Sequence, residues 1–160
     1  MTAKKMEESP EFLEIIEATT ARMKRRAQRK SISASSFERT IEETKEMFDT
    51  NDWSECKARH LVAIYDLMHT KVYGVDAADL NSTARYSYTM MANAFVKREF
   101  NGDYIRAVKF LRWAWNREGR WEKWRRENKT GGRRLTIYNL FSGRVLTEYR
   151  TDLARRHDHR

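Results

Sequence analysis

The amino-acid sequence predicts an all-α protein: a compact bundle of about five to six helices with an N-terminal helical arm. Two observations predict this class. The 160 residues include one proline and six glycines but many Glu, Lys, Arg, Ala and Met, a composition that favours helices over strands. Apolar residues also recur at spacings of three and four, the period of an amphipathic helix. A chain of this length can bury an ordinary core in one domain without disulfides or metal.

The first predicted helix begins at Ser9-Pro10-Glu11, with serine as the cap, proline at the first helical position and an acid in the first turn. Its charge runs from acidic to basic along the chain, which matches the helix macrodipole. A thin apolar stripe follows at helical spacing, formed by Phe12, Ile16, Thr19, Met23 and Ala27. Such a stripe is too narrow to define a core, so this helix is expected to dock on something else.

The expected domain boundaries follow from a serine-rich stretch at 31–36, which is typical of a linker. Residues 1–34 are therefore predicted to form the arm with its basic end and linker. Residues 35–156 are predicted to form the helical core domain, and residues 157–160 a tail.

Four further helices are expected inside the core domain. The first is predicted at about 35–49, opened by a capping box of Ser35 with Glu38, and the second at about 52–74, opened by Asp52 and ended by Gly74. The third is predicted at about 81–101, capped by Asn81 or Ser82. The fourth is predicted at about 104–128, with Gly119 as a break or kink. In the last of these, Tyr104, Val108, Leu111 and Trp115 form the face expected to pack on the core.

The segment 133–150 fits two structures. Leu135, Ile137, Val145, Thr147 and Tyr149 alternate around Ser142-Gly143, which indicates a hairpin. Phe141, Val145, Tyr149 and Leu153 fit a helix equally well, and the helix is favoured because the rest of the chain is helical.

The positive charge of the chain is concentrated in two short stretches. The range 106–134 has eleven Lys or Arg against three Glu, and the range 22–30 has six basic residues and no acid. The range 31–103 carries eight basic and twelve acidic residues, so the formal charge of +9 is not spread evenly. Clustered cations with interleaved tryptophans indicate a polyanion with flat bases as the partner.

On a helix, six basic and aromatic residues of this stretch fall at steps of three and four and share one face: Arg106, Lys109, Trp113, Arg117, Arg120 and Trp124. The candidate nucleic-acid-binding residues are Arg106, Lys109, Arg112, Trp113, Arg117, Arg120, Lys123, Trp124, Arg125, Arg126, Arg133 and Arg134, with Lys24, Arg25 and Arg26 on the arm. Trp113, Trp121 or Trp124 would stack on bases while the cations contact phosphates.

Each element of this interpretation has an alternative. Tryptophans in such patterns often belong to the core, with arginine packed on the ring, and a basic face can be a solvated surface without a partner. The segment Lys24 to Lys30 reads as a nucleic-acid arm, a solvated helix end or a nuclear localisation patch.

Catalytic and metal-binding patterns are not found in the sequence, so neither an enzyme nor a cofactor is expected. Cys56 and His60 are four residues apart, but no second pair of ligands supports a metal site. Gly131-Gly132-Arg133-Arg134 lacks the lysine and hydroxyl of a P-loop. A single cysteine suits a reducing compartment, and neither a membrane span nor a signal peptide is expected.

The region from about Lys71 to Arg150 contains a Tyr73-Gly74 loop, a helix, an Asn-Gly-Asp break, the sequence FLRWAW and a final LFSGRVLTEYR. This layout resembles the small helical C-terminal modules of phage and plasmid DNA-replication or helicase-loading proteins. The resemblance implies a mobile-element DNA-processing context, hence DNA before RNA, and assigns no functional residue.

The sequence therefore predicts a cytoplasmic, non-catalytic protein that binds nucleic acid through its phosphate backbone. The alternative is a protein-interaction or assembly subunit: a virion component, an adaptor, or a small helical subunit of an RNA-guided complex. In that case residues 10–28 would pair with another protein or with a second copy of the chain.

Overall fold

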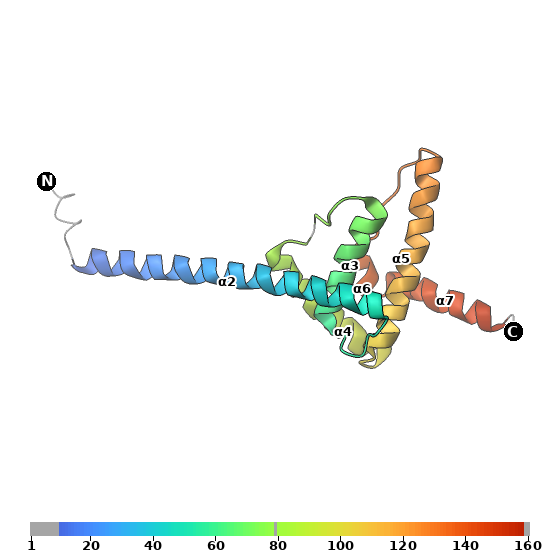
Figure 1. Cartoon of the computed structure of the whole chain (residues 1–160), viewed down its shortest axis with the longest axis horizontal. Helices are drawn as coiled ribbons and strands as arrows, with labels where there is room; N and C mark the ends of the chain where they lie inside the picture. Colours follow the sequence, from blue (N-terminus) through green and yellow to red (C-terminus); the bar gives the residue numbers. More distant parts are fainter. Residues whose placement is uncertain (1–9, 79, 159–160) are drawn as a thin grey trace. The chain divides into compact units, whose positions relative to one another are not determined.

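The computed structural model describes residues 10–78 and 80–158, and for residues 25–35, 82 and 83 it describes the backbone alone. The predicted all-α class is confirmed: these residues form six helices and no strand (Figure 1). The chain divides into two compact units, Met1–Glu38 and Arg39–Arg160. The expected serine cap at position 9 lies outside the described residues, as do the last two residues of the expected tail.

One helix, α2 (Pro10–Thr50), replaces the two helices and serine-rich linker expected for this part of the chain. The predicted break at 31–36 and the capping box at Ser35 are therefore wrong. No glycine or proline occurs between Glu11 and Tyr73, and serine costs a helix interior only a few tenths of a kcal/mol more than its best neighbours. Nothing in the stretch is strong enough to stop the helix.

The second unit is built around α3 (Ala58–Tyr73), which packs against α4 (Ser82–Phe100) and α5 (Tyr104–Glu127). The short α6 (Ile137–Phe141) packs on α4, and α7 (Arg144–Asp158) packs on α5 and α6. The largest fully buried side chains are Trp115, Tyr65, Phe95, Phe110 and Phe141. The helix alternative for 133–150 is thus confirmed, with Gly143 at φ +91° between α6 and α7.

The expected start of the third helix at Asp52 is wrong. Asp52 instead closes a turn, because its carboxylate accepts hydrogen bonds from the Ser54 backbone N–H and hydroxyl. Trp53 is buried in this turn, with its ring 4.9 Å from that of Phe48. The chain reaches α3 only at Ala58, after Lys57.

The predicted core face of α5 is confirmed for Val108, Leu111 and Trp115, which are buried, whereas Tyr104 is half-buried. Asp103 caps the first turn by accepting from the Arg106 N–H. The break expected at Gly119 is wrong, since α5 continues to Glu127. A glycine inside a helix costs about 1 kcal/mol relative to alanine, which a helix packed along one side tolerates.

In the described part of the chain, none of the helices combines the length and the apolar character that crossing a membrane requires.

Candidate nucleic-acid interface

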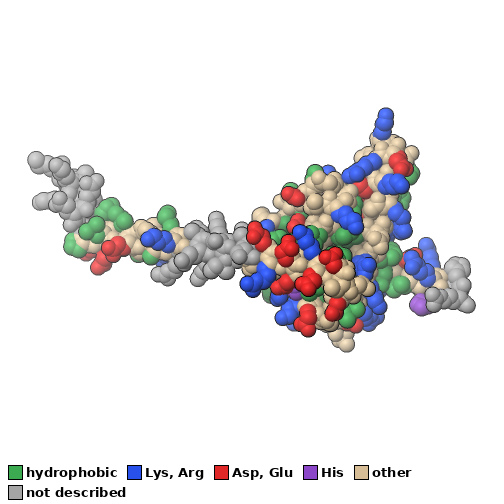
Figure 2. All heavy atoms as spheres, in the orientation of Figure 1, with side chains coloured by type: hydrophobic (Ala, Val, Ile, Leu, Met, Phe, Trp, Pro, Cys, Tyr) green, Lys and Arg blue, Asp and Glu red, His purple; other side chains and the backbone are tan. Residues whose placement is uncertain are grey.

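The predicted basic and aromatic residues of α5 fall into two groups in the structure: those engaged inside the fold and those exposed to water. Figure 2 shows Lys and Arg side chains along α5, whereas Asp and Glu side chains gather over the C-terminal part of α2. Basic and acidic residues that are separated along the sequence are therefore also separated in this view of the second unit.

Trp113 belongs to the engaged group. Its indole Nε1 donates a hydrogen bond of 3.0 Å to Asp152 Oδ2 on α7, and its ring centroid lies 5.2 Å from that of Tyr149. The Arg117 guanidinium covers the same ring at 5.0 Å from the centroid and forms an ion pair with Glu148. Trp113 is thus packed between α5 and α7, where no base could stack without displacing α7.

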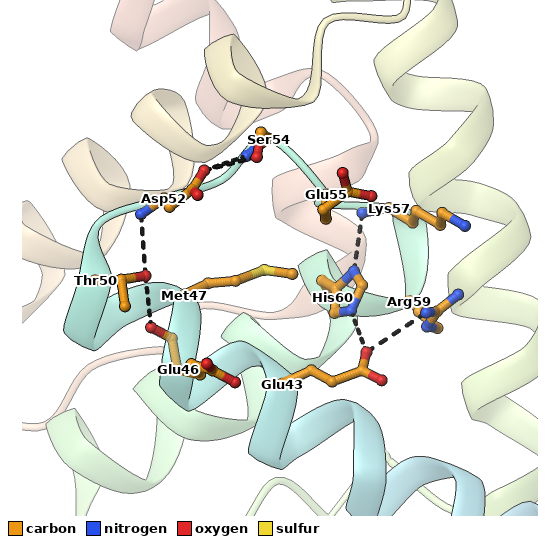
Figure 3. A pocket seen from close by; sticks show the side chains of 10 residues that line it. All are labelled: Glu43, Glu46, Met47, Thr50, Asp52, Ser54, Glu55, Lys57, Arg59 and His60. Atoms are coloured by element: carbon orange, nitrogen blue, oxygen red, sulfur yellow. Dashed lines mark hydrogen bonds and ion pairs between the residues drawn. The ribbon is translucent and has the colours of Figure 1, made fainter.

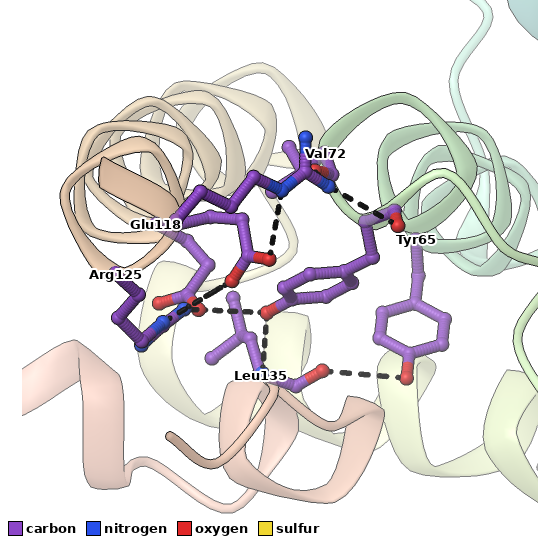
Figure 4. A network of polar contacts seen from close by, with 8 residues as sticks. Tyr65, Val72, Glu118, Arg125 and Leu135 are labelled. Atoms are coloured by element: carbon purple, nitrogen blue, oxygen red, sulfur yellow. Dashed lines mark hydrogen bonds and ion pairs between the residues drawn. The ribbon is translucent and has the colours of Figure 1, made fainter. Parts of the chain in front are cut away.

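Arg125 is the most enclosed of the predicted phosphate ligands, with its side chain only 15% exposed. Figure 4 shows it within a polar network on the core-facing side of α5. Its Nη2 pairs with Glu118 Oε1 and, at 3.0 Å, with Glu122 Oε2. Burial alone would lower the pKa of the guanidinium, but the bonds to Glu118 and Glu122 raise it, so Arg125 stays charged.

Tyr73 joins this network to the chain after α5. Its hydroxyl donates to Glu118 Oε1 at 2.8 Å and accepts from the Leu135 N–H at 2.6 Å. Burial is the main cause of the raised pKa of the Tyr73 phenol. A Cβ on Gly132 would stand 2.6 Å from Arg125 Cδ, so the loop between α5 and α6 approaches Arg125 closely. The network holds this loop against the helix.

Arg126 is also engaged, although its side chain is exposed. It pairs with Glu122 at 3.3 Å and donates to the carbonyls of Val72 and Tyr73 at the end of α3. Arg126, like Arg125 and Arg117, therefore has carboxylate partners within its own fold. Arg117 links α5 to α7 and Arg126 links α5 to the end of α3, whereas Arg125 pairs with two carboxylates of α5 itself.

The other predicted cations of this stretch are exposed and have no carboxylate partner in the described part of the chain. Arg112 donates to the Asn51 amide oxygen at 2.9 Å, and Arg134 lies over the Tyr73 ring at 5.2 Å. The exposed set is Arg106, Lys109, Arg112, Arg120, Lys123, Arg133 and Arg134. Lys24 is exposed in the first unit, and the side chains of Arg25 and Arg26 lie outside the described residues.

Two tryptophans near the end of α5 are half exposed, Trp121 at 50% and Trp124 at 49%. Their ring centroids are 5.9 Å apart and their planes meet at 84°, an edge-to-face pair. The two tryptophans line an open hollow of about 550 Å³ together with Arg117 and Arg120. The four residues that line this hollow are all basic or aromatic residues that the sequence singled out.

A second hollow, of about 420 Å³, lies between α2 and the start of α3 in the second unit (Figure 3). His60 is buried there, its Nδ1 accepting the Lys57 N–H at 2.9 Å and its Nε2 lying 2.7 Å from Glu43 Oε2. Because Nδ1 is an acceptor, Nε2 carries the proton and donates to Glu43. The basic nitrogen of the imidazole is thus occupied by the backbone, so His60 positions the start of α3 and cannot act as a general base as it stands.

The pKa shifts of His60, Glu43 and Cys56 follow from their burial and their hydrogen bonds. Burial lowers the pKa of His60, and the hydrogen bond from His60 lowers the pKa of Glu43. Burial raises the pKa of the Cys56 thiol to about 12, which leaves it protonated and unreactive. Cys56 precedes α3 rather than sharing a helix with His60, and the described residues hold no cluster of metal-ligating side chains.

Sequence reasoning missed the network around Arg125. Its signal was present in the spacing, since Glu122 precedes Arg125 by three and Arg126 by four residues, and both spacings allow helical ion pairs. The role of Tyr73 left no such signal, because Glu118 and Leu135 are 45 and 62 residues away along the chain.

No protein-family model, no curated protein and no solved structure matches this chain. The resemblance to replication and helicase-loading modules stays a prediction.

Proposed function

We propose that this chain binds nucleic acid without catalysing a reaction, using the exposed half of the basic face of α5. The observation that supports the proposal most directly is the hollow at Trp121 and Trp124, where two half-exposed indoles stand beside Arg117 and Arg120. Exposed indoles offer stacking surface, and cations beside them attract phosphates. A cytoplasmic location and the absence of a membrane partner are part of the proposal.

The phosphate contacts are assigned to the exposed cations that no carboxylate neutralises in the described structure. Arg106 and Lys109 lie near the start of α5, and Arg120 and Lys123 near its end. Arg133 and Arg134 follow in the loop that the Tyr73 network holds against the helix. Arg125 is assigned to the fold instead, because moving its guanidinium to a phosphate would leave the mostly buried Glu118 without a cation. Arg117 and Arg126 form more exposed ion pairs, which are weak, and are counted only as secondary contacts.

Fluorescence anisotropy with labelled single-stranded DNA, duplex DNA and RNA, at low and at moderate salt, tests the proposal. Affinity should fall as salt rises, because bound phosphates release counterions. Arg120→Glu combined with Lys123→Glu should weaken binding and reduce the salt slope by about 1.4 for a single strand, at about 0.7 per phosphate contact.

The matched control changes net charge equally on α2, with Arg39→Glu and Lys45→Glu. Both control residues are exposed and lie among acids, Lys45 in a surface ion pair with Glu42. This control should retain most of the affinity. Absence of binding to every polyanion, or binding indifferent to salt, would reject the proposed function.

A second candidate function, self-association through α2, has its own supporting observation in the first unit. Leu13, Ile16 and Met23 are exposed and recur at spacings of three and seven on one side of the helix. Acids precede bases along this segment, with Glu17 seven residues before Lys24. Two copies in antiparallel orientation would place the acidic end of each opposite the basic end of the other, whereas parallel copies would oppose like charges.

Light scattering on the full chain tests this candidate. Leu13→Glu with Ile16→Glu should convert a dimer to a monomer. Tyr86→Glu with Met90→Glu, which changes two exposed apolar residues on α4, should leave the mass unchanged. A monomeric parent protein would reject self-association and leave the nucleic-acid proposal intact.

A further inference from the structure

We infer that the hollow at Trp121 and Trp124 accepts unpaired bases, so the preferred ligand is single-stranded nucleic acid rather than a duplex. The inference rests on the proposed function and specifies its substrate class. It follows from the exposure of the two indoles, their mutual orientation and the charges that border them.

The two indoles keep surface available for a ligand. An edge-to-face pair covers at most one face of one ring, and each of these tryptophans remains half exposed to water. Elsewhere in the described structure the tryptophans are engaged: Trp53 and Trp115 are buried, and Trp113 is packed under α7. A flat ligand could therefore contact Trp121 or Trp124 without rearranging the fold.

The charges around the hollow disfavour cationic ligands that bind tryptophan. Aromatic cages for methylated ammonium groups need a site that attracts cations. Here Arg117 and Arg120 line the hollow, and Lys123 is the residue before Trp124. The indoles suit a flat ligand and the arginines suit a negatively charged one. A nucleotide within a strand has both a flat base and a negatively charged phosphate.

Base pairing decides between the two forms of nucleic acid. In a duplex each base is stacked on its neighbours, so its faces are inaccessible unless the helix is unstacked at a cost of a few kcal/mol per step. A single strand presents base faces at little cost, and stacking on an aromatic side chain contributes about 1–3 kcal/mol per base. The indoles consequently add affinity only for unpaired bases, while the cations act on either form.

Three probes separate stacking from charge: a twelve-nucleotide oligothymidine, an abasic strand with the same phosphates, and a duplex of the same length. Anisotropy on the full chain should give the tightest binding to oligothymidine. Trp121→Ala with Trp124→Ala should weaken that binding about 5- to 150-fold, the factor that 1–3 kcal/mol represents. Binding to the abasic strand and the duplex should change less than twofold.

The control replaces two other exposed aromatics, Tyr86→Ala with Tyr138→Ala, and should leave all three affinities unchanged. Circular dichroism confirms that every variant is folded. If the tryptophan variant binds oligothymidine as tightly as the parent, or loses all three probes equally, the inference is overturned although the proposed function stands. If the parent protein binds none of the probes, the proposed function itself fails.

Discussion

Trp113 and Trp124 lie on the same face of α5, eleven residues or about three turns apart, yet the two side chains have different surroundings. Trp113 is covered by α7, through Asp152 and Tyr149, and Arg117 closes over it. Trp124 pairs edge-to-face with Trp121 and remains half in water. Helical spacing therefore decides which side a residue faces, and the packing of a distant helix decides whether that side is available for a partner.

The largest expected effect concerns the covered tryptophan. Trp113→Ala removes the Asp152 hydrogen bond and the contacts with Tyr149 and Arg117, so it should lower the free energy of unfolding by about 2–3 kcal/mol. Urea denaturation followed by circular dichroism measures the change. A loss below about 0.5 kcal/mol would mean that α7 does not cover α5 in solution.

The next effect concerns Arg125, on the core-facing side of the same helix. Arg125→Ala leaves the mostly buried Glu118 without its cation and Glu122 with Arg126 alone, which should cost about 2 kcal/mol. Arg120→Ala is the matched control on the exposed side and should stay within about 0.5 kcal/mol. Equal stability of the two variants would contradict the distinction between engaged and exposed arginines.

A pH effect should come from His60 rather than from the basic face. Because burial lowers its pKa, the unfolded state takes up the proton first as pH falls below about 6.5, and stability declines. The lowered pKa of Glu43 adds a further decline below about 4.5, with the same sign. Urea denaturation from pH 8 to pH 4 measures both components.

Glu43→Gln separates the two components, since it keeps an acceptor for the His60 Nε2–H and removes the carboxylate. This variant should show a smaller decline below pH 4.5, where the lowered pKa values of Asp52 and Glu99 still contribute, and should keep the decline that begins near 6.5. A parent protein equally stable at pH 8 and pH 5 would show that His60 is not held in its neutral form.

The smallest effect on stability is expected for the exposed pair. Trp121→Ala and Trp124→Ala should each lower the free energy of unfolding by only about 1 kcal/mol, because half of each side chain is already in water and its main ring contact is the other tryptophan. A loss of 2 kcal/mol in either variant would assign these side chains to the fold.

Much of the architecture could be predicted from local patterns. The spacing of Val108, Leu111 and Trp115 identified the buried face of α5, and Gly74 marked the end of α3 correctly. The errors have local physical causes as well. The Asp52 carboxylate accepts a hydrogen bond from Ser54 within a turn instead of capping a helix. The serine-rich stretch contains no residue able to end α2.

The division of the basic face could not be predicted, because it depends on contacts between distant parts of the chain. Trp113 meets Asp152 across 39 residues, and Arg117 meets Glu148 across 31. Sequence spacing places all of these side chains on α5 or α7 but gives no indication of which turns the two helices share.

Tryptophan fluorescence during titration with oligothymidine tests the central claim most directly, because only Trp121 and Trp124 among the five tryptophans are half exposed. The account predicts quenching of the parent protein that disappears in Trp121→Phe with Trp124→Phe and persists in Trp113→Phe. Quenching that survives the double substitution, or no quenching while anisotropy reports binding, would contradict it.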